Sequence, residues 1–102
     1  MGFYSFRFGE MKVAQADAAS AKLMVVEVTF GFITPEQNTV ETIELTVHVL
    51  HDAERSVGAT EEEAYSRARQ LLREAADYCI ARNAKQLTEE AEKNRAFNIG
   101  SG

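Results

Sequence analysis

Two stretches of the sequence alternate apolar and polar residues, and this pattern constrains the fold more than any other feature. In the first, over residues 22–33, the apolar residues occupy alternate positions, namely Met24, Val26, Val28, Phe30 and Phe32. In the second, over residues 40–51, the same spacing is kept by Ile43, Leu45, Val47 and Val49. A period of two places each apolar set on one face of a β-strand. We therefore expect a β-hairpin with one apolar face that another element must cover.

The polar break at residues 34–39 is expected to form the hairpin loop, because Pro35 has no amide hydrogen to donate to a strand ladder. In the favoured register Phe30 lies opposite Ile43, and no like charges face each other. A slip of the register by one residue would place the apolar side chains on the solvent-exposed face, whereas a slip by two residues would not. The sequence therefore predicts the pairing of faces and leaves open a register two residues away.

The segment before the hairpin contains one further strand pattern and one ambiguous stretch. Residues 3–8 alternate in the same way and predict a short first strand that ends at Gly9, with Phe3 on the face opposite to Phe6 and Phe8. Residues 10–21 are rich in alanine, which favours a short helix, although an extended arm stays the alternative.

A long helix is predicted after the hairpin. Thr60 and Glu63 have the spacing of a capping box, in which each side chain accepts a hydrogen bond from the backbone amide of the other residue. An apolar stripe at helical spacing follows and includes Cys79, which we expect to be buried. The pattern weakens after residue 82, so a break near Asn83 stays open.

Together these elements predict the α+β class. The expected architecture has two layers, with a three-stranded antiparallel sheet in a β-α-β-β-α order, covered on one face by the long C-terminal helix. Residues 1–97 are expected to form a single domain and residues 98–102 a flexible tail.

Composition and charge narrow the range of functions. The 102 residues are 45 % hydrophobic and carry a formal charge of −5, which opposes binding to phosphate backbones and favours a basic partner surface. One cysteine allows no internal disulfide, and the sequence shows neither a signal-peptide pattern nor an apolar run of the ~20 residues that a membrane helix needs. We therefore expect a cytoplasmic protein.

Few residues are arranged for catalysis or metal binding. His48 and His51 are three apart, so they would point to opposite faces of one strand and could not hold one ion together. A nucleophilic Cys79 would need a nearby base and partial exposure, but its place on the apolar stripe favours a buried side chain. We expect no enzymatic activity and no metal or cofactor.

The candidate partner-binding residues lie on the polar sheet face, at the acidic start of the long helix and on its basic face. They are Glu27, Glu44, Thr46, His48, Glu61, Glu62, Glu63, Arg69 and Arg73. The small core and the exposed sheet edges also predict a homodimer, formed through either sheet edges or helices.

Three function hypotheses follow from these features. The favoured one is a non-enzymatic protein-binding module, an inhibitor that occludes a basic, nucleic-acid-binding surface of a partner. In size, acidity and layout the chain resembles small phage or mobile-element proteins that block a host protein, a resemblance that no residue motif carries. The alternative is a nucleic-acid-binding module that uses Arg67, Arg69, Arg73 and the Phe-rich first strand. The third is an enzyme subunit with a composite site.

Overall fold

The computed structural model describes residues 1–14, 23–52 and 54–101, with side chains up to Arg95. The elements follow the order β1 (Gly2–Ala14), β2 (Leu23–Thr34), β3 (Thr39–Leu50), α1 (Val57–Cys79) and α2 (Ala84–Ser101). They belong to the α+β class, as the sequence predicted. The chain divides into two compact units, Met1–Leu71 and Leu72–Gly102, and the boundary between them falls within α1.

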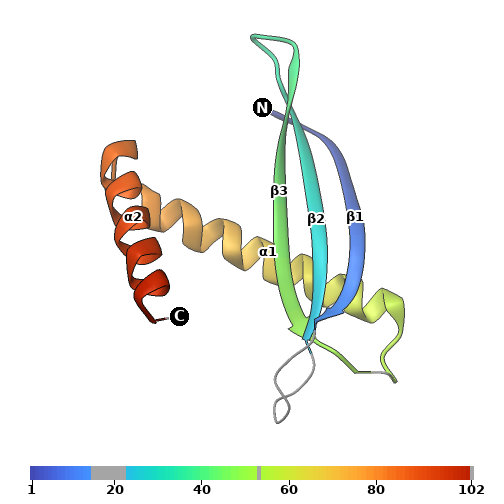
Figure 1. Cartoon of the computed structure of the whole chain (residues 1–102). Helices are drawn as coiled ribbons and strands as arrows, with labels where there is room; N and C mark the ends of the chain where they lie inside the picture. Colours follow the sequence, from blue (N-terminus) through green and yellow to red (C-terminus); the bar gives the residue numbers. More distant parts are fainter. Residues whose placement is uncertain (15–22, 53, 102) are drawn as a thin grey trace. The chain divides into compact units, whose positions relative to one another are not determined.

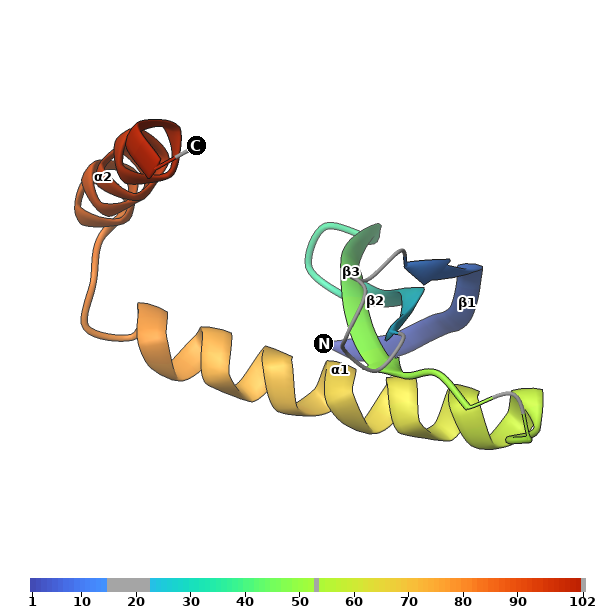
Figure 2. The same cartoon turned by 60° about the horizontal axis from the view of Figure 1, so that its bottom comes forward.

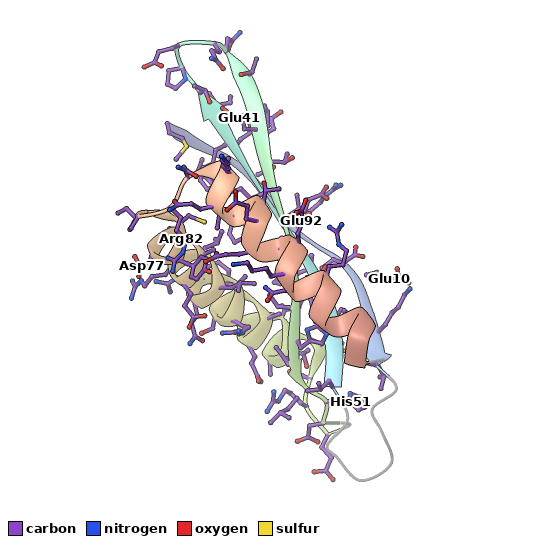
Figure 3. The ribbon with its side chains drawn as sticks, turned by 60° about the vertical axis from the view of Figure 1, so that its left-hand side comes forward. Glu10, Glu41, His51, Asp77, Arg82 and Glu92 are labelled. Atoms are coloured by element: carbon purple, nitrogen blue, oxygen red, sulfur yellow. The ribbon has the colours of Figure 1, made fainter. Side chains whose placement is uncertain are left out.

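The three strands form one antiparallel sheet in the order β1-β2-β3 (Figure 1). The predicted hairpin register is confirmed, with Phe30 opposite Ile43 and Glu27 opposite Thr46. Pro35 lies in the loop, which is closed by two backbone amides that donate to the Thr34 carbonyl oxygen. Near this loop the Thr34 hydroxyl also donates to the carboxylate of Glu41 on β3, at 2.6 Å. Figure 3 labels Glu41 near the hairpin loop. The structure therefore selects the favoured register over the one two residues away that the sequence left open.

Strand β1 is longer than the sequence predicted and is interrupted by two register shifts, one between Phe3 and Ser5 and one between Phe8 and Met11. The prediction of a strand ending at Gly9 is wrong, because Gly9 lies inside the second irregularity, where the lack of a side chain is an advantage. The predicted short helix is wrong for residues 10–14, which are extended, and its remaining residues 15–21 lie outside the described residues.

The first register shift also corrects the predicted orientation of Phe3. One extra residue in β1 turns Phe3 back to the face that carries Phe6 and Phe8, so Phe3 pairs with Phe32 on the apolar face. The rings of Phe3 and Phe32 meet edge to face, with their centroids 6.1 Å apart. An unbroken alternation would have placed Phe3 on the opposite face.

The predicted helix start at Thr60 is wrong by one turn. Ser56 is the N-cap, since its hydroxyl oxygen accepts a hydrogen bond from the Ala59 amide at 3.1 Å. Thr60 lies inside α1, where its amide and its hydroxyl both donate to the Ser56 carbonyl oxygen. Ser56 and Thr60 are both good capping residues one turn apart, and the earlier one adds a further turn of helix. Glu63, freed from the cap, pairs with Arg55.

The core of the first unit is made of valine and alanine side chains. Val26, Val28 and Val47 are the large side chains that are almost wholly removed from solvent, at 0–2 % exposure. From α1 the small residues Ala64 and Ala68 are fully buried. Figure 2 shows residues 57–71 of α1 passing beside the sheet. The apolar side chains that α1 buries are therefore small.

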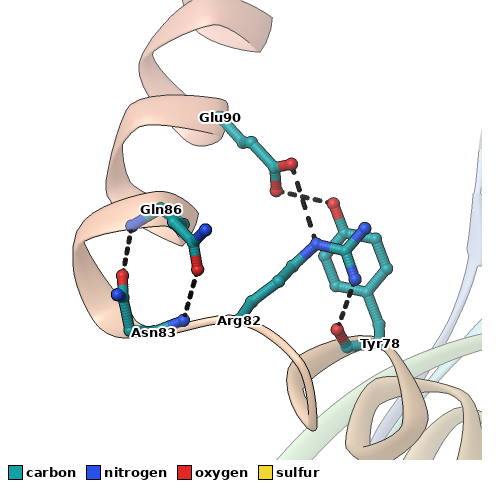
Figure 4. Close-up of polar contacts among 5 residues, drawn as sticks. All are labelled: Tyr78, Arg82, Asn83, Gln86 and Glu90. Atoms are coloured by element: carbon teal, nitrogen blue, oxygen red, sulfur yellow. Dashed lines mark hydrogen bonds and ion pairs between the residues drawn. The ribbon is translucent and has the colours of Figure 1, made fainter.

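The second unit has a different organisation. The sequence left open whether the long helix breaks near Asn83, and the structure shows that it does. A capping box begins α2: the Asn83 side-chain oxygen accepts from the Gln86 amide at 2.9 Å, and the Gln86 side-chain oxygen accepts from the Asn83 amide at 2.8 Å (Figure 4). The prediction that Cys79 is buried is wrong, because it is exposed. No described side chain of the second unit is buried, so the apolar stripe of α1 continues into the second unit without being buried there.

Candidate functional site

Two concave surfaces lie within the first unit. We name the first the polar basin, defined by the side chains of Arg7, Glu27, Thr29, Glu44 and Thr46. We name the second the aromatic groove, which is lined by Phe3, Phe6, Phe8, Phe30, Phe32, Glu62 and Tyr65. The two surfaces carry different residue types, so they suit different ligands.

The polar basin forms because the strand register aligns side chains in rows across the sheet. Arg7 of β1 lies opposite Thr29 of β2, which lies opposite Glu44 of β3. Glu27 and Thr46 form the neighbouring row. The concavity has a volume of about 410 Å³. The structure therefore brings together three of the residues selected from the sequence and adds Arg7, which the sequence argument did not select.

Gly9 allows the Glu27 side chain to lie across β1 at this basin. A Cβ atom at Gly9 would approach the Glu27 carboxylate oxygen to 2.8 Å, which is closer than real contacts, and the Glu27 Cβ to 3.1 Å, which is closer than most. Both Glu27 and Glu44 are exposed to solvent, however. An open basin with two solvated carboxylates and one guanidinium gives little basis for acid–base chemistry, which needs a desolvated environment.

The aromatic groove is built from β1, β2 and α1. Its rings contact one another: Phe6 lies 5.0 Å from Phe30 and 5.4 Å from Tyr65, measured between ring centroids. Phe30 and Phe32 stack at 6.4 Å with an interplanar angle of 12°. These distances fall in the range of favourable aromatic pairs, so the walls of the groove support each other.

The groove is open at the end formed by Phe3. This side chain remains 67 % exposed, whereas Phe30 deeper in the sheet is 7 % exposed. The volume of the groove is about 440 Å³, and Glu62 is its one charged lining residue. A contiguous group of aromatic side chains that remains partly open to solvent is a feature of interaction surfaces.

The three carboxylates at the start of the predicted helix do not form one acidic surface. Glu62 lines the aromatic groove, Glu63 pairs with Arg55, and Glu61 is half-buried at a third position around the helix. Successive helical residues are about 100° apart around the axis, which separates their side chains. Of these three carboxylates, only Glu62 lines the groove.

The remaining residues selected from the sequence are dispersed. His48 is exposed on the polar face opposite Val25, and the Arg69 guanidinium lies over the Tyr65 ring, 5.8 Å from its centroid. Arg73 is exposed and belongs to the second unit. Over residues 1–14, 23–52 and 54–101, no cluster of three or more His, Cys, Asp or Glu is placed to hold a metal ion.

The aromatic groove was not predicted from the sequence, although the sequence contains a signal for it. Phe3, Phe6 and Phe8 form part of an unusually aromatic first strand. The register shift at Tyr4 places all three on one face of the sheet, and no residue type in the sequence indicates that shift. Tyr65 was not selected, because its contact with Phe6 depends on how α1 approaches the sheet.

Comparison with protein families, with curated proteins and with solved structures finds no match for this chain. Within the described part of the chain, no helix is both long and apolar enough to cross a membrane.

Proposed function

We propose that this chain is a non-enzymatic protein-binding module whose aromatic groove receives an apolar segment of a partner protein. The observation that carries the proposal is the composition of the groove, which has six aromatic side chains and one carboxylate around an open volume of about 440 Å³. Aromatic residues dominate the energy of protein interfaces because each buries a large area with few rotatable bonds.

We infer further that α1 covers only part of the apolar sheet face. The valines of β2 and β3 are buried where the small side chains Ala64 and Ala68 of α1 are also buried. Towards the hairpin loop, Phe3 and Ile43 remain 67 % and 39 % exposed. An apolar face left open in this way is stabilised when a partner removes it from water.

The partner is expected to place a basic residue beside its apolar anchor. Glu62 supplies a negative charge at the groove, and the chain as a whole carries a formal charge of −5. Such charges favour encounter with a basic surface and orient the partner once it is bound. Basic surfaces of this kind bind nucleic acid in many proteins. A module that occupies such a surface would therefore inhibit the partner's binding of nucleic acid.

The test uses the full chain as bait and compares groove variants with a matched control. Phe3→Ser and Glu62→Lys alter exposed groove residues, while Val13→Ser alters an exposed apolar residue of the same strand outside the groove. We expect a specific protein whose affinity falls about tenfold or more with each groove variant, a loss of ~1.4 kcal/mol, and is kept by Val13→Ser. A partner that binds all three variants equally would contradict the proposal.

A further inference from the structure

Strand β3 has an unusually regular outer edge. It lies at one side of the sheet, and its register with β2 is unbroken from Thr39 to Leu50. The opposite edge strand, β1, carries two register shifts and the basic residues Arg7 and Lys12. Natural sheets protect their edges with bulges, proline and charged side chains, lysine above all. Strand β3 has no bulge, proline or lysine, and its charged side chains are two glutamates. The β3 edge is therefore ready to pair with another strand.

Two exposed apolar residues on β3 indicate which strand pairs with its free edge. Val40 and Leu50 are 44 % and 54 % exposed. By their even positions they lie on the polar face, together with Thr42, Glu44, Thr46 and His48. They stand near opposite ends of β3, about 33 Å apart at ~3.3 Å per residue. They cannot cover each other within one chain.

We propose that β3 pairs antiparallel with β3 of a second copy of this chain, with Leu45 of one copy opposite Leu45 of the other. A two-fold axis perpendicular to the sheet then passes between the two leucines and keeps the same faces on the same side. In this register Val40 of each copy lies opposite Leu50 of the other, and Ile43 lies opposite Val47. All four exposed end residues of the two copies thereby gain an apolar neighbour.

The charges of β3 agree with this register. Glu44 faces Thr46 of the other copy, Thr42 faces His48, and Glu41 faces Val49, so no carboxylate lies opposite another. Moving the centre of pairing to residue 44 would place Glu44 against itself. Moving the centre to residue 46 would set Leu50 opposite Thr42 and would carry Val40 past the end of the strand. The leucine-centred register is the one that satisfies both the charges and the apolar ends.

Pairing through β3 is independent of the aromatic groove. The groove is lined by residues of β1, β2 and α1, and no β3 residue takes part in it. The dimer is therefore a continuous sheet of six strands, three from each copy, that presents two grooves. A partner with two matching segments, or a dimeric partner, would bind such a dimer with higher avidity than a single copy.

The test introduces charges at the paired ends of β3. Val40→Lys and Leu50→Glu are prepared as separate proteins, with Val13→Lys on the exposed part of β1 as the matched control. Mass and dissociation constant are measured by sedimentation and light scattering. We expect the unaltered chain and Val13→Lys to be dimers at micromolar concentration, and each β3 variant to dissociate about tenfold more readily.

Mixing the two β3 variants gives the decisive result. In a mixed dimer the lysine introduced by Val40→Lys lies opposite the glutamate introduced by Leu50→Glu, and one Val40–Leu50 pair is retained. We therefore expect dimers to reform on mixing. Amide spectra of the separate variants show whether each is folded. If either variant is not folded, both are replaced by the reversed pair, Val40→Glu and Leu50→Lys. A monomeric parent chain, or a mixture that does not reform dimers, would overturn the proposal.

Discussion

The two units of this chain are stabilised in different ways. In Met1–Leu71, three valine side chains of the sheet are almost completely buried, and alanines of α1 are buried with them. In Leu72–Gly102 no described side chain is buried, and polar contacts join the end of α1 to α2. A sheet face gives a helix a broad apolar surface to cover, whereas a pair of mainly polar helices has none. The core, and with it the aromatic groove, therefore belongs to the first unit.

The contacts of the second unit centre on Tyr78, Arg82 and Glu90 (Figure 4). The Tyr78 hydroxyl donates to the Glu90 carboxylate at 2.6 Å, and the Arg82 guanidinium lies over the Tyr78 ring, 3.7 Å from its centroid. Arg82 also donates to the Tyr78 carbonyl oxygen at 2.7 Å. Tyr78 is 47 % exposed, and contacts in such solvated positions contribute little stability individually.

The largest expected effect comes from the valine core. Val28→Ala removes two methyl groups from a side chain with 0 % exposure, and we expect it to lower the free energy of unfolding of the first unit by about 2 kcal/mol. Val13→Ala, at a position 48 % exposed, should change it by less than ~0.5 kcal/mol. Urea unfolding followed by the amide signals of β2 measures both, and equal losses would contradict a core centred on Val28.

A smaller effect is expected at the start of α1. Ser56→Ala removes the cap that accepts the Ala59 amide and should lower the free energy of unfolding of the first unit by about 1 kcal/mol. Thr60→Val keeps the shape of a buried side chain and should change it by less than ~0.5 kcal/mol. The same urea titration measures both losses. A larger loss of stability for Thr60→Val than for Ser56→Ala would show that Thr60 is the cap.

A comparable local effect is expected at the start of α2. Asn83→Ala breaks the reciprocal bonds with Gln86 and should destabilise α2 by about 1 kcal/mol. Carbon chemical shifts of residues 84–95 should move toward coil values, while those of β2 stay unchanged. Lys85→Ala, an exposed neighbour, is the matched control. A loss of β2 signals with Asn83→Ala would show that the two units unfold together.

The smallest effect is a pH dependence in the second unit. The hydrogen bond from the Tyr78 hydroxyl to Glu90 raises the pKa of Tyr78 above its ordinary value of 10.0. Because the pKa is raised in the folded state, this contact stabilises the fold below pH 10.0. That stabilisation is lost as the pH rises through the higher pKa that Tyr78 has in the folded state.

Titration of the Tyr78 ring carbon signal measures that pKa directly. Glu90→Gln removes the charged acceptor, so we expect the midpoint to fall toward 10.0. Glu89→Gln, which neutralises the preceding and exposed carboxylate, should leave the midpoint in place. If Glu90→Gln left the Tyr78 midpoint unchanged, the hydrogen bond to Glu90 would not be the cause of the raised pKa.

Much of the sheet was predictable because alternation is a local pattern that specifies a face directly. The pairing of apolar faces follows from that pattern, whereas the choice of Phe30 opposite Ile43 over a register two residues away was favoured by the charges and decided by the structure. The polar basin residues Glu27, Glu44 and Thr46 were selected from the same reasoning, and they do lie together.

Other features were not predictable, for identifiable physical reasons. A register shift adds one residue without any compositional mark, so Phe3 was assigned to the wrong face and the groove was missed. Ser56 and Thr60 offer equivalent caps, and the choice depends on the packing of α1. The helical stripe that includes Cys79 continues past the point where the first unit ends, so helical periodicity alone overestimated burial.

The central claim is that the first unit has a closed valine core and an open aromatic groove. Relaxation of side-chain protons by a soluble paramagnetic reagent compares the two regions in one sample of the unaltered chain. We predict strong relaxation of the Phe3 ring protons, which are on a side chain 67 % exposed, and almost none of the Val28 methyl protons, at 0 % exposure. A Phe3 ring protected as fully as the Val28 methyl groups would contradict the claim.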